Sequence, residues 1–434
     1  MFLNFKQAWN LIKQEKLFSS VYIFGTGLSI TVVMVLSIVF YIRIASIYPE
    51  TNRDRMLTVK SGTFVGISNG DISAASLSLK TIETCFRSLQ NAEAVSAIYK
   101  PWGVSHYIQP DGSKEQIPVT INYIDNDFWK VFSFRFLSGA PFTEADFQSG
   151  IHTAVISEST AKRYLGTVDA VGMYISLNFL QYRVCGVVKD VSFATPVTYA
   201  QLWVPYTVNP GYKRSFAEDL LGNLRLYILA SSAGDIGKIK EEVLENVRKL
   251  NNTIPDDYEF RLLGQPDKHW ESTFRFGSNS FPDFNKILLQ YGLIFLILLL
   301  VPGISLSGMI DSRMERRLPE MGIRRVFGSP MKNLMLQIFS ENFLFTLLGG
   351  LAGLLFSYIL ILISSDWIMT IGQRFMELPA DGGAVVFTPE MLINIPVFLI
   401  TLGVCFILNI LAAFIPAWRA SHKEIIYSLN AKQF

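Results

Sequence analysis

The side chains that most often do chemistry in proteins are sparse in this chain of 434 residues. It has four histidines and three cysteines: His106, His152, His269, His422, Cys85, Cys185 and Cys405. No two histidines have the spacing of an HExxH metal helix, and the cysteines are too few and scattered for a zinc site or a disulfide scaffold. The sequence contains no G-x-x-x-x-G-K-[ST] phosphate loop and no G-x-S-x-G nucleophile elbow. We therefore expect no catalytic, cofactor-binding or metal-binding residue.

Three other groups of residues have mainly structural interpretations. Four aspartates lie in tight pairs: Asp125, Asp127, Asp256 and Asp257. Neither pair has the spacing of a calcium loop, and we interpret them as solvated turn residues. Cys85 and Cys185 could form a disulfide in an oxidising compartment, although the subdomains assigned to them below differ. The aromatic residues between 128 and 136 are interpreted as core rather than as a ligand box.

One charged segment, 311–335, could bind a partner. Its candidate contact residues are Arg316, Arg317, Glu320, Gly322, Arg324, Arg325 and Gly328. The four arginines can pair with acidic side chains on a protein surface, and the two glycines permit close backbone approach or a turn. The same positive charges could instead enforce membrane topology or contact anionic lipid headgroups, and charge alone favours this second interpretation.

Long apolar runs are the elements that would position this segment. No Asp, Glu, Lys or Arg occurs in 17–42, 287–310, 342–365 or 391–418. Each run exceeds the roughly 20 apolar residues that cross a bilayer as a helix. Only 17% of the residues are charged, against about 25% in soluble domains. We predict a membrane protein with four transmembrane helices rather than buried core helices.

The charge pattern also sets the predicted boundaries and orientation. We expect an interfacial amphipathic helix at 1–17, transmembrane helices at 18–42, 287–310, 336–365 and 391–416, a large domain at 43–286, a coupling segment at 311–335, a short external loop at 366–390 and a tail at 417–434. Twelve Lys and Arg lie in the two termini and the coupling segment, against Arg374 alone in the external loop. By the positive-inside rule, both termini are cytoplasmic and the large domain is extracytoplasmic.

Glu341 is the one Asp, Glu, Lys, Arg or His within the predicted spans, and it lies near a membrane boundary. Ion-coupled carriers usually place such groups inside the bilayer, so their scarcity argues against a proton- or sodium-driven carrier. The net charge of +2 gives no reason to expect a nucleic-acid partner.

The large domain has a mixed α+β pattern. Two β-α-β units are predicted, with strands at 55–60, 94–99, 224–229 and 258–263 and helices at 76–89 and 235–250. A ferredoxin-like, porter-type subdomain is composed of two such units, and we predict that fold here. Between them, about 101–222 is richer in strands and turns, and we interpret it as a second subdomain inserted into the first.

Several motifs resemble one known family. Asp127-Phe-Trp-Lys-Val-Phe-Ser-Phe and Val155-Ile-Ser-Glu-Ser-Thr-Ala-Lys-Arg-Tyr-Leu-Gly resemble the MacB-like periplasmic core domain. Glu320-Met-Gly-Ile-Arg-Arg-Val-Phe-Gly-Ser, with Glu341 downstream, resembles the FtsX-type permease signature, and Ile415-Pro-Ala-Trp-Arg-Ala its closing motif. The motifs occur in family order around a one-plus-three arrangement of helices. Pro302-Gly303, inside the second predicted span, departs from the pattern and predicts a kink.

The resemblance implies a permease subunit of an ABC transporter in the bacterial inner membrane. In that family, ATP-driven motion of the membrane helices is transmitted to the external domain, a process called mechanotransmission, for export or extraction of a substrate. Because this sequence contains no phosphate loop, we expect ATP to be bound and hydrolysed by a separate ATPase subunit. The chain itself would then be no enzyme and hold no cofactor. Its implied partners are the ATPase, which the coupling segment would contact, a second permease copy, a periplasmic adaptor or other external partner, and the lipid bilayer.

An alternative within the resemblance is an FtsX-like signalling or scaffold protein that regulates an external partner such as a cell-wall hydrolase. The two-subdomain external region favours export, because division-type relatives usually carry a smaller one. The sequence leaves the substrate open among peptides, lipoproteins, drugs and lipids.

Overall fold

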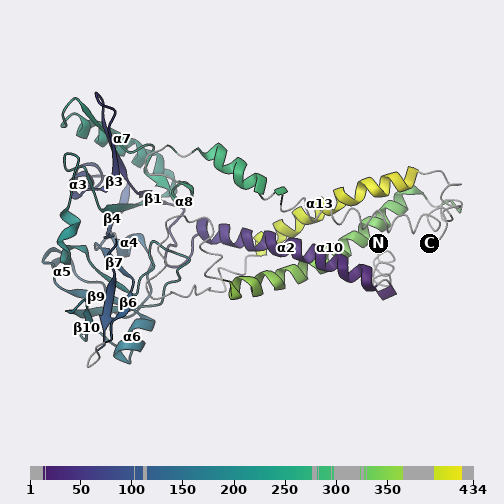
Figure 1. The fold of residues 1–434 in the computed structure, drawn as a ribbon, viewed down its shortest axis with the longest axis horizontal. Coiled ribbons are helices and arrows are strands. Elements are labelled where there is room, and N and C mark those ends of the chain that lie inside the picture. The colour runs from purple at the N-terminus through teal and green to yellow at the C-terminus, as the bar shows by residue number, and fades with distance from the viewer. Residues whose placement is uncertain are drawn as a thin grey trace. The chain divides into compact units, whose positions relative to one another are not determined.

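The computed structural model describes residues 13–14, 16–101, 103–110, 115–275, 281, 283–294, 296–297, 323, 327–328, 330–364 and 395–422. The chain divides into two compact units. The first, which we call the helical unit, comprises 1–41, 284–369 and 388–434, and the second, the sheet domain, comprises 42–283 and 370–387. Figure 1 shows the long helices of the first unit and the strands of the second.

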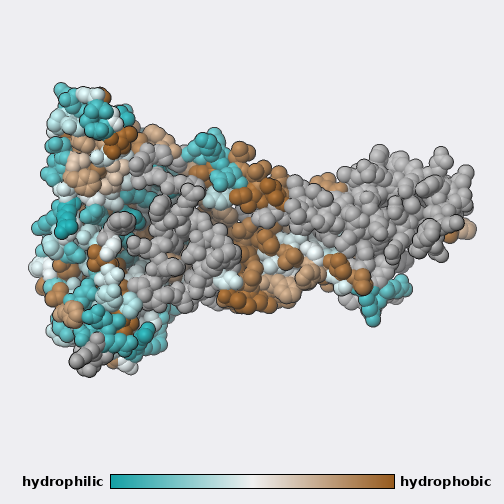
Figure 2. Space-filling view, in the orientation of Figure 1, coloured by the Kyte–Doolittle hydropathy of each residue, from teal (hydrophilic) through white to brown (hydrophobic). Residues whose placement is uncertain are grey.

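The helical unit contains the long helices α2 (Lys16–Ile44), α10 (Met331–Ile363) and α13 (Ile395–His422), and residues 284–294 are helical as well. Ser19–Ile44 and Phe339–Ile363 are each long and apolar enough to cross a membrane, and α13 contains the shorter apolar stretch Ile395–Ile407. Large apolar side chains are exposed along these helices (Figure 2). A surface of this kind suits lipid rather than water.

Several predicted segments lie wholly or largely outside the described residues. They are the amphipathic helix at 1–17, the span at 287–310 with its Pro302-Gly303 kink, most of the coupling segment, the external loop at 366–390 and the tail beyond 422. In the tail, the structure shows the last helix continuing to His422, past the predicted boundary at 416.

The relative directions of the helices follow from four contacts. The rings of Tyr22 and Phe345 lie 5.0 Å apart, and Thr31 Oγ1 donates to the carbonyl of Gly353 at 3.1 Å. Residue numbers therefore rise together along α2 and α10, which makes these helices parallel. Gly350 faces Leu402, and the rings of Phe343 and Phe406 are 5.0 Å apart, so α10 and α13 are antiparallel.

The first part of the sheet domain is built around four antiparallel strands. In spatial order they are β16 (Asp267–Lys268), β1 (Met56–Val59), β14 (Leu224–Ala230) and β4 (Ala92–Tyr99). The helices α3 (Leu79–Cys85) and α7 (Ile236–Asn251) contact each other, and Asn246 Nδ2 donates to the carbonyl of Cys85 at 3.0 Å. In α7 the residues at helical spacing are buried: Ile236, Ile239, Val243, Val247 and Leu250.

One predicted strand pairs differently from the β-α-β expectation. The segment predicted at 258–263 forms β15 (Tyr258–Arg261), but it pairs with β2 (Gly62–Gly66) rather than with β1. β2 pairs in turn with β3 (Ile72–Leu77). The strand beside β1 is instead the two-residue β16, which is too short to leave a periodic signal in the sequence.

The strand-rich region continues the same sheet. Beyond β4 the order is β7 (Ile121–Ile124), β12 (Leu202–Pro205), β9 (Thr153–Ser157), β11 (Leu180–Val188), β10 (Tyr174–Leu177), β5 (His106–Gln109) and β6 (Ile117–Val119), with β8 (Phe136–Gly139) also paired to β11. The antiparallel contact of β4 with β7, at Ile98 opposite Ile124, joins the two parts of the domain.

The motif beginning at Val155 has a clear structural reason. It runs from β9 into the helix α6 (Glu158–Leu165). Ser157 accepts a hydrogen bond from the backbone N–H of Thr160 as the helix N-cap, and Gly166 ends the helix with a φ of 73°. A hydroxyl residue before the helix and a glycine in the left-handed region after it are standard helix boundaries.

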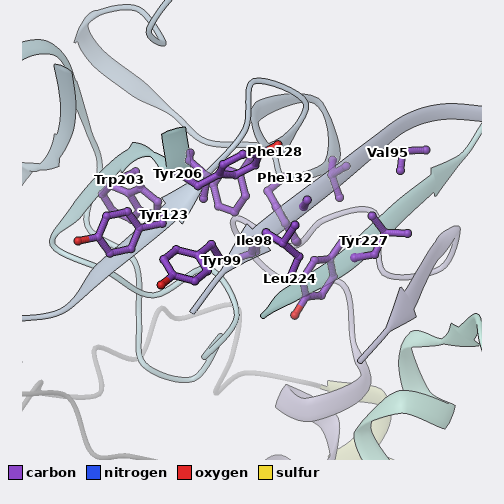
Figure 3. Close-up of a cluster of buried hydrophobic side chains, with 14 of the residues drawn as sticks. Val95, Ile98, Tyr99, Tyr123, Phe128, Phe132, Trp203, Tyr206, Leu224 and Tyr227 are labelled. Atoms are coloured by element: carbon purple, nitrogen blue, oxygen red, sulfur yellow. The ribbon is translucent and has the colours of Figure 1, made fainter. Parts of the chain in front are cut away.

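The core of the sheet domain is rich in aromatic side chains (Figure 3). The helix α4 (Phe128–Val131) places Phe128 against Phe132 with ring centroids 4.8 Å apart, and Phe132 lies 5.6 Å from Tyr227 of β14. Trp203 of β12 is fully buried beside Phe134. These contacts join both parts of the domain, which agrees with the interpretation of residues 128–136 as core.

Candidate functional site

The structure describes only a small part of the predicted coupling segment. Arg316, Arg317, Glu320, Gly322, Arg324 and Arg325 lie outside the described residues. Gly328 is described and has a φ of 85°. No atom in the described part of the chain lies within 4 Å of the Cβ that another residue would add there, so the backbone conformation alone favours glycine. A turn therefore precedes α10, which begins at Met331.

Glu341 is buried near the start of the apolar part of α10, with 1% of its surface exposed. Gln337, one turn earlier, donates to its Oε1 from Nε2 at 3.2 Å. Its neighbours Ser340 and Asn342 are buried as well. An ionisable side chain within an apolar helix is costly when it faces lipid. Burial against protein is therefore the arrangement that a membrane-boundary glutamate requires.

Close packing joins α2 to α10 further along. A Cβ added at Gly353 would lie 2.6 Å from the carbonyl oxygen of Gly27, and one at Gly349 would lie 2.9 Å from Thr26 Cβ. Small residues let the backbones of membrane helices approach each other in this way.

A buried polar cluster of the sheet domain lies where the chain enters and leaves it. We call the segments 42–54 and 262–275 the stem. Arg53 is buried and donates from Nη1 to the carbonyls of Ile42 and Ala45, both at 2.6 Å. Its Nε and Nη2 each lie 2.8 Å from Oε2 of the buried Glu50. Arg53 thereby satisfies carbonyls at the C-terminal end of α2, where intrahelical partners run out.

The entry half of the stem is also tied to the strand-rich region. Thr198 Oγ1 donates to Glu50 Oε1 at 3.1 Å, and Trp203 Nε1 donates to the carbonyl of Thr198 at 3.2 Å. The backbone N–H of Ser133 donates to the carbonyl of Pro49 at 2.8 Å. The segment after α2 is thus held by bonds to residues distant in sequence.

The exit half of the stem contains a second buried ion pair. Arg275 donates to both carboxylate oxygens of Asp267, from Nε at 2.5 Å and from Nη2 at 2.7 Å, and both side chains are buried. Lys60 Nζ donates to the carbonyl of Ser272 at 2.5 Å. Burial lowers the pKa of Lys60 to about 8, an effect increased by Arg225 and opposed by Asp267.

One hydrogen bond connects the two halves. His269, the first residue of α8 (His269–Phe274), donates from Nε2 to the carbonyl of Arg43 at 2.9 Å. Burial, followed by the positive charge of Arg53, lowers the pKa of His269 to about 4. The imidazole is therefore neutral at pH 7, and its other ring nitrogen carries no proton when Nε2 donates.

The stem was not predicted from the sequence. Its residues are separated by more than 200 positions, and only the spacing of Glu50 and Arg53 is local. That i, i+3 pair of opposite charges directly after an apolar run is the one signal that could have drawn attention to the entry half. The buried ion pairs and the hydrogen bonds to backbone carbonyls in the stem hold its backbone segments in fixed register.

A second buried polar cluster corrects the interpretation of Asp125. This aspartate is only 3% exposed and is no solvated turn residue. It accepts from Ser96 Oγ at 2.8 Å and from the backbone N–H of Ala97 at 2.9 Å, and pairs with Arg87 Nη2 at 3.1 Å. Burial raises its pKa to about 6 although Arg87 opposes the shift. Asp125 thus connects the end of β7 to β4 and to the segment after α3.

The remaining candidates for chemistry give no reactive site. Asp256 and Asp257 are exposed, as predicted. Cys85 and Cys185 are free thiols, and burial raises the pKa of each to about 12, so neither is a thiolate at neutral pH. Among the residues that the structure describes, no three His, Cys, Asp or Glu side chains are grouped to hold a metal ion.

Comparisons with known families match both parts of the chain. The profile of the MacB-like periplasmic core domain matches residues 19–246, and that of the FtsX-like permease C-terminal region matches residues 292–425. The first profile alone spans more than half of the chain. The region that the first profile matches contains the motifs beginning at Asp127 and Val155. The region that the second profile matches contains the FtsX-type signature beginning at Glu320.

Three curated relatives illustrate the similarity. The chain is 26% identical over 245 residues to the "Uncharacterized ABC transporter permease YknZ" of Bacillus subtilis, covering 56% of this chain and 58% of the relative. It is 23% identical to the "Pyoverdine export ATP-binding/permease protein PvdT" of Pseudomonas syringae pv. tomato, covering 71% and 42%. It is 24% identical to the "Macrolide export ATP-binding/permease protein MacB 2" of Aeromonas hydrophila, covering 58% and 37%. The matches thus span less than two thirds of each relative.

Solved structures resemble the chain over about half its length. The periplasmic region of MacB from Actinobacillus actinomycetemcomitans superposes with a TM-score of 0.35 at 17% identity, covering 49% of this chain and 89% of that one. The extracellular domain of YknZ, described as a noncanonic ABC-type transporter from Gram-positive bacteria, gives a TM-score of 0.32 at 17% identity, covering 46% and 98%.

Proposed function

The chain belongs to the ABC transporter permeases that combine a MacB-like periplasmic core domain with an FtsX-like permease C-terminal region, and from this we propose that it converts ATP hydrolysis into movement of its extracytoplasmic domain. Members of the family are embedded in the membrane and carry an extracytoplasmic domain. The ATPase would be a separate subunit, although the relatives PvdT and MacB 2 are named as combined ATP-binding/permease proteins.

The observation that carries the proposal is the stem. A helix that moves in the membrane can displace an external domain only if its end is held there, and Arg53 holds two carbonyls at the C-terminal end of α2. Two buried ion pairs, Glu50–Arg53 and Asp267–Arg275, give the stem strong and directional bonds. Removing one partner of such a pair costs about 3–5 kcal/mol. Small displacements would therefore be transmitted rather than absorbed.

The helix directions support the proposed orientation. α2 and α10 are parallel and α10 and α13 antiparallel. The starts of α2 and α10 and the end of α13 would therefore face the same side of the membrane. The charge asymmetry of the loops assigns that side to the cytoplasm. The coupling segment, which precedes α10, would then face the ATPase.

The cargo and the assembly are also proposals. We propose a bacterial inner-membrane complex with a second, identical permease copy, because the chain lacks an internal repeat of its helices and ABC transporters use paired ATPase sites. It would export or extract a substrate with the help of a periplasmic adaptor or other external partner. The names of PvdT and MacB 2 favour export over an FtsX-like signalling role.

The coupling role is tested by reversing charges in the coupling segment. The double variant Arg324→Glu, Arg325→Glu should lose stimulation of the co-purified ATPase, because like charges would then face an acidic or polar partner surface. The sheet domain should remain folded. Arg324→Gln, Arg325→Gln is the matched control, with insertion checked by protease protection because inside positive charges also guide topology. A correctly inserted Glu variant that binds its ATPase and transports normally contradicts the proposal.

The orientation is tested by labelling single cysteines in spheroplasts. Ser113→Cys should react with an impermeant thiol reagent, and Ser312→Cys should not. Labelling of Ser312→Cys in intact spheroplasts would show that the topology is wrong. Mass spectrometry of the purified membrane complex then separates export from signalling, since the first expects an adaptor and the second a hydrolase or its regulator.

A further inference from the structure

Two large hydrophobic side chains are exposed next to the hydrogen bond between His269 and Arg43. Ile44 directly follows Arg43, Trp270 directly follows His269, and each side chain is 42% exposed. The bond holds α8 against the backbone of α2 at 2.9 Å. The apolar stretch of α2 ends at Ile44. Trp270 therefore lies beside the point at which this stretch ends.

The end of a membrane-spanning helix lies at the boundary between acyl chains and headgroups. Tryptophan is enriched at that boundary because its ring is apolar while its N–H is polar. Lys268, two residues before Trp270, is exposed. A basic side chain at this depth suits the phosphates of lipid headgroups. Both features match one occupant, which is the bilayer surface.

We propose that α8 anchors the sheet domain to the membrane, with Trp270 and Ile44 inserted at the headgroup level of the outer leaflet. The anchor deepens the proposed function and rests on it, because it takes α2 as a spanning helix. The anchor would hold the stem at the membrane surface. Movement of α2 would then rotate the sheet domain at this surface rather than move it away from the membrane.

The test measures the depth of single sites in the full chain, reconstituted in lipid nanodiscs. A version with its three cysteines replaced by alanine carries an environment-sensitive fluorophore on Trp270→Cys. Nanodiscs contain lipids with a nitroxide quencher either near the headgroup or near the end of the acyl chain. The fluorophore at 270 should lose most of its emission to the shallow quencher, and little to the deep quencher or to aqueous iodide.

Two reference sites make the result decisive. Leu244, which is 53% exposed on α7, is the matched external site, and Leu244→Cys should be quenched by iodide alone. Leu28, exposed within α2, reports the span itself, and Leu28→Cys should be quenched by the deep nitroxide. If the fluorophore on Leu28→Cys is quenched by the deep nitroxide and the one on Trp270→Cys is quenched by iodide alone, like that on Leu244→Cys, the anchor is overturned while the proposed function stands. If the fluorophore on Leu28→Cys is not quenched by the deep nitroxide, α2 does not span the membrane, and the anchor is overturned as well.

A second measurement keeps an aromatic side chain in place, in case the cysteine variant folds poorly. Photoreactive p-benzoylphenylalanine at 270 should form adducts with phospholipid when the nanodiscs are irradiated. The same residue at 244 should form none. Adducts at 270 with protein alone would show that another chain covers this surface, and would overturn the anchor.

Discussion

His269 donates a hydrogen bond to the backbone carbonyl of Arg43 at 2.9 Å, and so joins the segment that leaves the sheet domain to the helix that enters it. The two residues are 226 positions apart. Because burial and Arg53 lower the pKa of His269 to about 4, its imidazole is neutral at pH 7 and takes up a proton only as the pH falls toward 4.

We expect acid to weaken the protein through His269. The native state binds the proton less readily than the unfolded chain, whose histidine has a pKa of about 6.5. The stabilising contribution is thus complete above pH 6.5 and is lost as the pH falls toward 4, up to about 3 kcal/mol. The variant His269→Gln keeps a hydrogen-bond donor but does not titrate. Thermal unfolding of its full chain should therefore lack the pH dependence that His269 contributes between pH 6.5 and pH 4. An unchanged pH profile in the Gln variant would contradict the assignment.

Asp125 should give a pH dependence of the opposite sign. Its native pKa of about 6 lies above the ordinary 3.8, so the native state binds the proton more readily and gains stability as the pH falls through 6 toward 4. Asp125→Ala should be less stable than the wild type by about 2–4 kcal/mol, because Ser96 Oγ and the N–H of Ala97 lose their acceptor and Arg87 loses one of its carboxylate partners. The deficit should grow by about 1 kcal/mol between pH 7 and pH 5. A deficit that shrinks over this interval would rule out the raised pKa.

These two residues also show where prediction from the sequence ends. The helix predicted at 235–250 and the strand predicted at 224–229 appear as α7 and β14, because their apolar residues carry the signal within the segment itself. Asp125 was misinterpreted because Asp-Asn-Asp is typical of a turn, while its partner Arg87 stands 38 positions away. Pairing over such separations depends on the fold, and no local pattern encodes it.

The contact between α2 and α10 predicts a sharp difference between two glycines. Gly353→Ala places a methyl group 2.6 Å from the carbonyl oxygen of Gly27, so the helices must separate, at a cost of about 1–3 kcal/mol. Gly403→Ala in α13 meets no atom within 4 Å in the described part of the chain and should be neutral or slightly stabilising. Melting temperatures in nanodiscs and disulfide trapping between α2 and α10 measure both effects. Equal behaviour of the two variants would argue against the tight helix contact.

The last prediction separates holding the fold from transmitting movement. Replacing Glu50 or Arg53 alone by methionine leaves a buried charge without its partner, and should lower the stability by about 3–5 kcal/mol. Replacing both removes the charges together, which is often close to neutral for stability. The double variant nevertheless lacks the hydrogen bonds from Arg53 to the carbonyls of Ile42 and Ala45.

We therefore expect Glu50→Met, Arg53→Met to insert, bind its ATPase and hydrolyse ATP, yet to lose most of its external activity. The matched control is Glu158→Met, Lys162→Met, which removes an exposed pair on α6 that contributes about 0–1 kcal/mol. ATPase rate and transport, measured on the same proteoliposomes, give the ratio of hydrolysis to external work. If the double variant keeps the wild-type ratio, the bonds at the end of α2 serve folding alone, and transmission must use another part of the chain.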